Sequence, residues 1–415
     1  MDPRKQPREL KARRLRPFVT CFLLGFVSGA PLAVVVTLLQ AWLKDGGVSL
    51  TSIGLLTIAG LPYSLKFLWS PWLDYLAPFG RRRHGWLAIS QVALFGLMWA
   101  LSYANPQDLP LVTLLALAIS FASATQDVAV DAYRREDLAD EEIAVGSAMY
   151  IWGYRLGMTA ISGVLLALAE PLGWSLTFKL AAFLLILGPL TLTFSPEPKV
   201  SPTRPTSLAE SVVKPLREFF SRSRPFLLLG FVFFYRFGEQ FISSINTAFF
   251  LSVGYTKLEI GLVVKAFGLV STLGGVSLAG YLMRRWGLIN CLWLFGWLQI
   301  FNCACLTALW LLPPKVDHLA ILISLDHLSV GGGSAVFVAF LTSQTHLSHS
   351  ATQYALLTSL MALPRSLLAA PSGFLAEVFG WPIFYLLGAI FTLPGLYLLK
   401  LLIEKGLTRP LTQKA

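Results

Sequence analysis

Charge is scarce in this chain. Only 13% of its 415 residues are Asp, Glu, Lys or Arg, whereas 55% are hydrophobic. Soluble domains carry about 25% charged residues, so this composition argues against a soluble globular enzyme. Intrinsic disorder is excluded because apolar residues dominate, and collagen-like or coiled-coil chains are excluded because the 33 Gly and 24 Pro follow no short period. The composition indicates a membrane protein.

Cysteines and recognised catalytic motifs are also few. Cys21, Cys291, Cys303 and Cys305 all lie in apolar runs, where Cys ordinarily serves as a small packing residue. There is no phosphate-binding Gly-x4-Gly-Lys-Ser/Thr loop, which argues against ATP-driven transport. No Ser/His/Asp set and no metal-ligand set has a recognised spacing. We therefore expect no enzyme activity, no metal and no cofactor.

Long apolar runs fill most of the sequence. A helix needs about 20 apolar residues to cross the roughly 30 Å hydrocarbon core of a membrane. Such runs lie near residues 18–40, 51–76, 86–104, 109–133, 143–169, 174–194, 225–252, 258–282, 288–311, 318–345, 352–376 and 381–402. They predict an all-α integral membrane protein with 12 transmembrane helices in two bundles of six.

Positive charge indicates which side of the membrane each loop occupies. Twenty-three Lys and Arg lie in the two tails, the central linker and alternate loops, whereas the opposite loops hold only Lys44, Lys257 and Lys315. Because loops rich in Lys and Arg stay inside, both termini and the linker are predicted to be cytoplasmic. The net charge of +11 then reflects topology and contact with anionic membrane lipid, not nucleic-acid binding.

The two halves of the chain echo each other. We expect a basic N-terminal tail at 1–17, a six-helix bundle at 18–194, a Pro-rich linker at 195–224, a second bundle at 225–403 and a C-terminal tail at 404–415. Ile-Gly-Leu begins at residues 53 and 260, and Arg155 and Arg365 each precede a glycine by eight residues. Two six-helix repeats joined by a cytoplasmic linker are the layout of major facilitator transporters.

The loop after the second apolar run carries an acid followed by a basic cluster. Asp74 precedes Gly80, Arg81, Arg82 and Arg83. The pattern partly matches the loop signature of major facilitators, in which the acid and the basic cluster are closer together. It predicts an electrostatic latch on the cytoplasmic gate. The alternative is a loop whose arginines only set the topology.

Ten of the ionisable residues inside the apolar runs are candidates for a polar cavity. Each costs at least about 2.5–3.5 kcal/mol at the centre of a membrane, so such residues normally face a polar cavity or one another. The ten are Lys66, Asp127, Asp131, Arg155, Arg236, Glu239, Lys265, Asp326, His327 and Arg365. So many buried charges are expected of a transporter and not of a chain that only packs helices.

Two of these acids lie on one helix face, because Asp127 and Asp131 are four residues apart. Asp131 lies beside Arg134 and Arg135 near the cytoplasmic end, so we expect it to form a structural or gate-latching ion pair. Asp127 follows Gln126 and lies deeper in the membrane. It is therefore the better candidate for a cavity residue.

Two sets of charges leave alternatives open. Arg236 and Glu239 are three residues apart and either line a cavity or satisfy each other. Arg155 and Arg365 hold equivalent positions in the two halves. They offer bidentate forks to an anionic substrate, or they pair with Asp127 and Glu239.

The tenth run holds an acid, a histidine and a group of small residues. Asp326 and His327 are adjacent, so they project about 100° apart, and either can carry a coupling proton. The glycines at 331–333 predict close helix approach, with gate bending as the alternative.

Two other function classes fit the sequence less well than a transporter. A membrane-embedded acyltransferase could use Asp317 and His318, but the repeated six-helix pattern argues against it. A receptor that transports nothing does not require so many buried charges.

Several strings closely resemble the AmpG-type muropeptide permeases of the major facilitator superfamily. They are SATQDVAVDAYR at 123–134, GYRLGM at 153–158, GLPYSLKFLWSPWLD at 60–74, FGRRRHGW at 79–86, LLQAWLKDGGVSL at 38–50, EIGLVVKAFGL at 259–269, VFVAFLTSQ at 336–344 and ATQYALLTSL at 351–360. The resemblance runs through nearly the whole chain. Eukaryotic acetyl-CoA transporters are more distant relatives.

This resemblance implies a monomeric importer of anhydromuropeptides in the bacterial inner membrane, driven by the proton gradient and serving cell-wall recycling. It implies that Lys66, Gln126, Asp127, Tyr154 and Arg155 lie in or near the cavity. The lactyl and peptide carboxylates of a muropeptide would suit the two equivalent arginines at 155 and 365.

The second half departs from the family pattern at three polar places. These are the Arg236–Glu239 segment, the Asp326-His327 pair and the exit of the tenth run at 345–349. All three can contact cargo. A ferric siderophore therefore stays the alternative cargo, because a compact branch of the same superfamily imports such complexes.

Overall fold

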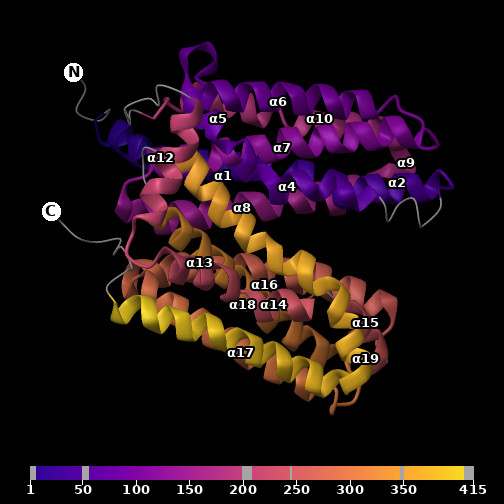
Figure 1. Ribbon diagram of the computed structural model, residues 1–415. Coiled ribbons are helices and arrows are strands. Elements are labelled where there is room, and N and C mark those ends of the chain that lie inside the picture. Colours follow the sequence, from indigo (N-terminus) through magenta and orange to yellow (C-terminus); the bar gives the residue numbers. More distant parts are fainter. Residues whose placement is uncertain (1–5, 49–55, 199–207, 244, 346–349, 406–415) are drawn as a thin grey trace. The chain divides into compact units, whose positions relative to one another are not determined.

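The computed structural model describes residues 6–48, 56–198, 208–243, 245–345 and 350–405. Every regular element in these ranges is a helix (Figure 1), which confirms the predicted all-α class. Nine helices in this part of the chain are long and apolar enough to cross a membrane. The other three predicted runs, at 51–76, 258–282 and 352–376, each include side chains outside the described residues.

The chain forms two compact units. Unit 1 comprises 1–142, 149–216 and 345–356, and unit 2 comprises 143–148, 217–344 and 357–415. The change from one unit to the other at 216/217 falls inside the predicted linker. Two short segments belong to the unit of the other half: residues 143–148 and residues 345–356.

Unit 1 is built around α7 (Leu109–Asp137). Its other helices are α1 (Gln6–Ala33), α2 (Leu39–Asp45), α4 (Leu61–Leu65), α5 (Ser70–Tyr75), α6 (Arg82–Leu101), α8 (Ile143–Thr159), α9 (Leu166–Leu172), α10 (Trp174–Leu184) and α11 (Leu187–Phe194). Figure 1 shows α1 and α6 running beside α7, and both pack against it. Because the second half of α7 is enclosed in this way, its polar residues are buried with its apolar ones.

Unit 2 is built around α18 (Val316–Gln344), which packs against α16 (Lys257–Trp286) and α17 (Leu288–Leu309). Its remaining helices are α13 (Pro225–Phe234), α14 (Phe237–Ser243), α15 (Asn246–Val253) and α19 (Ser350–Glu404). The linker helix α12 (Leu208–Phe220) joins the two units, because the division falls within it. Helix α19 also changes unit, after residue 356.

Glycines set the closest helix contacts in unit 1. Gly25 and Gly29 of α1 face α8, and Gly153 and Gly157 of α8 face α1. A Cβ added to Gly153 would lie 1.8 Å from the carbonyl oxygen of Phe22, and a Cβ at each of the other three would lie 2.2 Å from a backbone oxygen. The two Gly-x3-Gly pairs therefore let the backbones touch, as small residues do in membrane bundles.

Glycines also allow close contact between helices in unit 2, where the sequence predicted close helix approach at 331–333. A Cβ on Gly331 would lie 2.3 Å from the carbonyl oxygen of Thr272 on α16, and one on Gly332 would lie 2.0 Å from the ring of Phe295 on α17. Close helix approach therefore accounts for these two glycines.

We expect Gly153→Ala to destabilise the folded protein. The new methyl group meets rigid backbone, so α8 must move away from α1, at a cost of about 1–3 kcal/mol or more for overpacking. Gly96→Ala in α6 is the matched control, because a Cβ there meets nothing within 4 Å. Thermal unfolding of the two variants in detergent measures the difference. Equal melting temperatures for both variants would contradict this account of the α1–α8 contact.

Glycine also allows two equivalent sharp turns between helices. Gly173 has φ 77° and ψ 158° between α9 and α10, and Gly380 has φ 75° and ψ 164° within the range of α19. Residues with side chains do not adopt this region. A tryptophan follows each glycine, so the repeated Gly-Trp pair of the sequence corresponds to a repeated backbone turn.

Candidate functional site

A row of charged side chains runs along one face of α7. Asp127, Asp131 and Arg134 are spaced by four and three residues, and all three are buried, with exposed fractions of 8%, 4% and 1%. Lys66, which lies in the short helical segment after α4, is also buried, and its Nζ is 3.9 Å from Asp131 Oδ2. Two acids and two cations thus share the interior of unit 1.

Asp131 lies between the two cations. Its Oδ1 accepts a hydrogen bond of 3.2 Å from Arg134 Nη2, and Lys66 approaches the other carboxylate oxygen. Arg134 Nη2 also donates to the hydroxyl of Tyr354 at 2.8 Å, and the guanidinium lies 4.6 Å from the ring centre of Tyr150. The two cations compensate the buried charge of Asp131. The contact with the Tyr150 ring and the bond to Asp131 compensate the buried charge of Arg134.

Asp127 is much less well satisfied. It lies within electrostatic range of Lys66 and Asp131, but among the described residues its Oδ1 has no hydrogen-bond partner. Ser28 of α1 lies next to it, and the Ser28 hydroxyl is likewise without a partner in hydrogen-bond geometry. Buried polar atoms normally find partners, so unsatisfied atoms indicate a site that water, a proton or a ligand completes.

Other polar groups near Asp127 share this lack of partners. Gln126 Nε2 donates to the carbonyl oxygen of Val27 at 3.0 Å, whereas its Oε1 is buried without a partner in the described part of the chain. The hydroxyls of Tyr63 and Ser123 lie near each other, but neither has a partner in hydrogen-bond geometry among the described residues. This polar cluster was not predicted as a whole, although Gln126 and Asp127 were.

The remaining candidates in the first half lie on α8. Tyr154 and Arg155 are half-buried, and the Tyr154 ring centre lies 6.1 Å from that of Tyr150. Tyr154 is also within electrostatic range of Tyr63, so it borders the polar cluster. Arg365 belongs to α19, but its side chain lies outside the described residues.

In unit 2 the predicted pair Arg236–Glu239 is formed. Arg236 Nε donates to Glu239 Oε2 at 2.9 Å, and a second, shorter contact joins Arg236 Nη2 to Glu239 Oε1. Gln299 of α17 donates to the same carboxylate at 3.3 Å. The two charges therefore satisfy each other, with Gln299 as a third partner.

Asp326 and His327 contact different helices, as adjacent residues of a helix must. Asp326 accepts a hydrogen bond of 2.5 Å from Asn302 Nδ2 of α17, and His327 Nδ1 lies 3.1 Å from Thr272 Oγ1 of α16. Asp326 is 8% exposed and makes no ion pair among the described residues. The amides Gln299 and Asn302 were missed by the sequence reasoning because uncharged polar residues are common in apolar runs.

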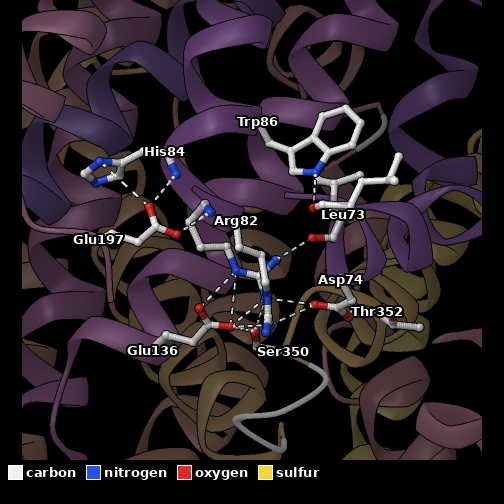
Figure 2. A network of polar contacts seen from close by, with 11 residues as sticks. Leu73, Asp74, Arg82, His84, Trp86, Glu136, Glu197, Ser350 and Thr352 are labelled. Carbon is white, nitrogen blue, oxygen red and sulfur yellow. Dashed lines mark hydrogen bonds and ion pairs between the residues drawn. The ribbon is translucent and has the colours of Figure 1, made fainter. Parts of the chain in front are cut away.

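Asp74 and two of the three arginines after it form a dense polar network, which we call the latch: Asp74, Arg82, Arg83, Glu136, Ser350 and Thr352. Figure 2 shows Asp74, Arg82, Glu136, Ser350 and Thr352 gathered at this network. Arg83 is 1% exposed and lies at its centre. Its Nη2 donates to Asp74 Oδ1 at 2.8 Å, and its Nε donates to Glu136 Oε2 at 3.0 Å. Arg82 Nη2 reaches both acids, at 3.2 and 2.9 Å.

The latch also holds the first turn of α19. Asp74 Oδ2 accepts hydrogen bonds from the backbone nitrogen of Thr352 at 3.0 Å and from its hydroxyl at 2.7 Å. Ser350 Oγ receives a hydrogen bond of 3.0 Å from Arg83. Arg81, in contrast, has an exposed side chain. Three members of the latch, Glu136, Ser350 and Thr352, were not predicted; Glu136 directly follows Arg134-Arg135, and its charge was the one available signal.

The chain matches the family model described as Major Facilitator Superfamily over residues 21–368. It is 38% identical over 384 residues to the anhydromuropeptide permease of Escherichia coli (strain K12), covering 91% of this chain and 78% of that protein. It is 32% identical to the putative transporter AmpG 4 of Rickettsia conorii, covering 92% of this chain and 96% of that protein.

Solved structures share the fold at low sequence identity. A bacterial homologue of the iron transporter ferroportin, in an outward-facing state, has a TM-score of 0.70 at 14% identity and covers 94% of this chain and 98% of its own. The proton:xylose symporter XylE has a TM-score of 0.65 at 14% identity, with 95% of each chain covered. With its apolar helices and buried charges, the chain belongs to the major facilitator superfamily and is a multi-pass inner-membrane transporter of small molecules, not an enzyme.

Proposed function

We propose that this transporter imports 1,6-anhydromuropeptides, the GlcNAc-anhydroMurNAc peptides of cell-wall recycling, by proton-coupled alternating access. The observation that carries the proposal is the 38% identity over 384 residues with a protein named anhydromuropeptide permease. The similarity to a putative AmpG transporter, which covers 92% of the chain, supports the same cargo. We expect the protein to work as a monomer without a bound cofactor.

Asp127 is the residue we propose for the coupling proton. It is buried beside Lys66 and Asp131, and its Oδ1 has no hydrogen-bond partner in the described part of unit 1. Protonation of Asp127 removes one negative charge from the cluster of Lys66, Asp127 and Asp131. The ammonium of Lys66 then interacts with the Asp131 carboxylate only. Asp326, buried beside Asn302 without an ion pair among the described residues, is the second candidate, and His327 is the third.

Cationic groups supply the expected contacts to an anionic glycopeptide. Lys66 and Arg155 are predicted cargo residues of unit 1, and Tyr154 precedes Arg155 on α8. We propose that the carboxylates of the cargo compete with Asp131 for Lys66. Arg236 and Glu239 are better explained as a structural pair, because each satisfies the charge of the other.

The latch is the part we propose as the cytoplasmic gate. Alternating access requires contacts that form on one side of the membrane and break when that side opens. Asp74 and Arg83 bind the first turn of α19. The part of this helix after residue 356 belongs to unit 2. Breaking these bonds would release that turn from unit 1. Arg134 donates to the hydroxyl of Tyr354 near the start of α19 and is bonded to Asp131, so we expect this pair to reinforce the latch.

Uptake by right-side-out membrane vesicles tests the cargo and the energy source together. We expect labelled anhydromuropeptide to accumulate when a proton gradient is imposed, and a protonophore to abolish the accumulation. Vesicles without the protein are the control. Accumulation that survives the protonophore would contradict proton coupling. Uptake of a ferric siderophore in place of the muropeptide would overturn the proposed cargo.

A further inference from the structure

The start of the linker is bound tightly to unit 1. We call residues Ser195–Glu197 the linker strap. Ser195 Oγ lies 3.0 Å from Thr20 Oγ1 of α1, and the Pro196 carbonyl oxygen accepts a hydrogen bond of 3.1 Å from the hydroxyl of Tyr133 on α7. Each of the first two residues of the strap is therefore fixed to a different helix of the bundle.

The third residue of the strap binds the beginning of α6. Glu197 Oε1 accepts a hydrogen bond of 2.7 Å from the backbone nitrogen of Arg83, and Oε2 accepts one of 2.9 Å from that of His84 (Figure 2). The first N–H groups of a helix have no partner within the helix, and the N-cap residue of α6, Arg81, offers no side-chain acceptor. A carboxylate more than a hundred residues later in the chain therefore caps this helix.

Arg83 is consequently held at both ends. Its backbone nitrogen binds Glu197, while its guanidinium binds Asp74 and Glu136. The guanidinium can meet both acids only if the first turn of α6 has the correct position. Around the Glu197 carboxylate, His84 Nδ1 lies 3.8 Å away, and the His84 ring stacks on Tyr133. The strap and the latch therefore meet at one residue.

We propose that Glu197 is a positioning residue of the latch: by capping α6 it fixes the backbone of Arg83, so that the linker controls how firmly the first turn of α19 is held. This inference rests on the gate role proposed above. It predicts an effect that passes from the linker through Arg83 and Asp74 to Ser350 and Thr352. A carboxylate that only capped α6 would have no effect on α19.

Hydrogen exchange of the detergent-purified full-length protein distinguishes the two cases. The test variant is Glu197→Gln, in which the side chain retains one acceptor oxygen but faces the second N–H group with an amide NH₂. We expect exchange to become about tenfold faster in the first turn of α6 and also at 350–356 in α19. Glu197→Asp, which keeps both acceptors on a shorter side chain, should fall between the variant and the wild type.

Glu404→Gln is the matched control. Glu404 lies at the opposite end of α19 from residues 350–356 and pairs with Lys400 at 3.7 Å, so its loss should change neither segment. Faster exchange in α6 with unchanged exchange at 350–356 would overturn the proposal and leave Glu197 as a simple cap. The measurement needs no cargo, so it stands even if vesicle uptake contradicts the muropeptide assignment. Size-exclusion profiles of the variants show whether a general loss of folding explains the result.

Discussion

Asp127→Asn should abolish proton-driven uptake while the protein remains folded in the membrane. The substitution keeps the size of the side chain and removes its ability to carry a charge and a titrating proton. It costs little stability, because Asp127 makes no ion pair with a described residue and its Oδ1 has no hydrogen-bond partner among them. We expect initial uptake rates to fall by at least a hundredfold, to the level of vesicles without the transporter. A hundredfold lower rate corresponds to an increase of about 2.7 kcal/mol in the activation free energy of transport.

Asp108→Asn is the matched control on the same helix. Asp108 caps the start of α7 by accepting a hydrogen bond from the Leu111 nitrogen at 3.2 Å, and Asn caps helices equally well. The Asp108→Asn variant should take up cargo at the wild-type rate. Asp127 can act in proton coupling or in cargo binding, and exchange of labelled for unlabelled cargo without a proton gradient separates these two roles. If exchange persists in Asp127→Asn, Asp127 acts in coupling. If exchange is lost, Asp127 acts in binding. Unimpaired uptake would remove it from the mechanism.

Local spacing indicated which charged residues are near enough to pair. Arg236 and Glu239 are three residues apart, and they form an ion pair within one turn. Asp131 and Arg134 have the same separation and are likewise bonded. The Asp131–Arg134 pair needs only the geometry of a helix, which the long apolar runs already predict, whereas Arg236 lies in the turn between α13 and α14. The all-helical class follows from the same runs, because a backbone inside lipid must satisfy its own hydrogen bonds.

Long-range contacts could not be predicted from spacing. Asp74 and the arginines after it were predicted to form a latch, with a topology signal as the alternative, but Thr352 follows Asp74 by 278 residues and Ser350 follows Glu136 by 214. Ser and Thr carry no charge, so nothing distinguished these two from the many others in apolar runs. The Gly-x3-Gly pairs at 25/29 and 153/157 are visible in the sequence, yet which helices they bring together depends on the fold.

Single Gln substitutions at Arg81, Arg82 and Arg83 should have sharply graded effects. Arg83 is almost fully buried and bonds to Asp74, Glu136, Ser350 and the carbonyl oxygen of Leu73. Arg83→Gln leaves two buried acids with only Arg82 to compensate them, and breaking a buried ion pair costs about 3–5 kcal/mol. We expect it to lower uptake by at least tenfold and to speed hydrogen exchange at 350–356.

The other two arginines provide internal controls. Arg82 is more accessible, with a side-chain exposure of 11%, and makes one bond to each acid, so Arg82→Gln should reduce uptake by a few fold. Arg81 is exposed, and Arg81→Gln should have no effect. Each of the three substitutions removes one positive charge from the same basic cluster at the start of α6. If the arginines only set topology, the three variants would behave alike, whereas a latch requires the order Arg83, Arg82, Arg81. Arg83→Lys should not restore transport, because a single ammonium cannot bind Asp74 and Glu136 in the way that the guanidinium fork does.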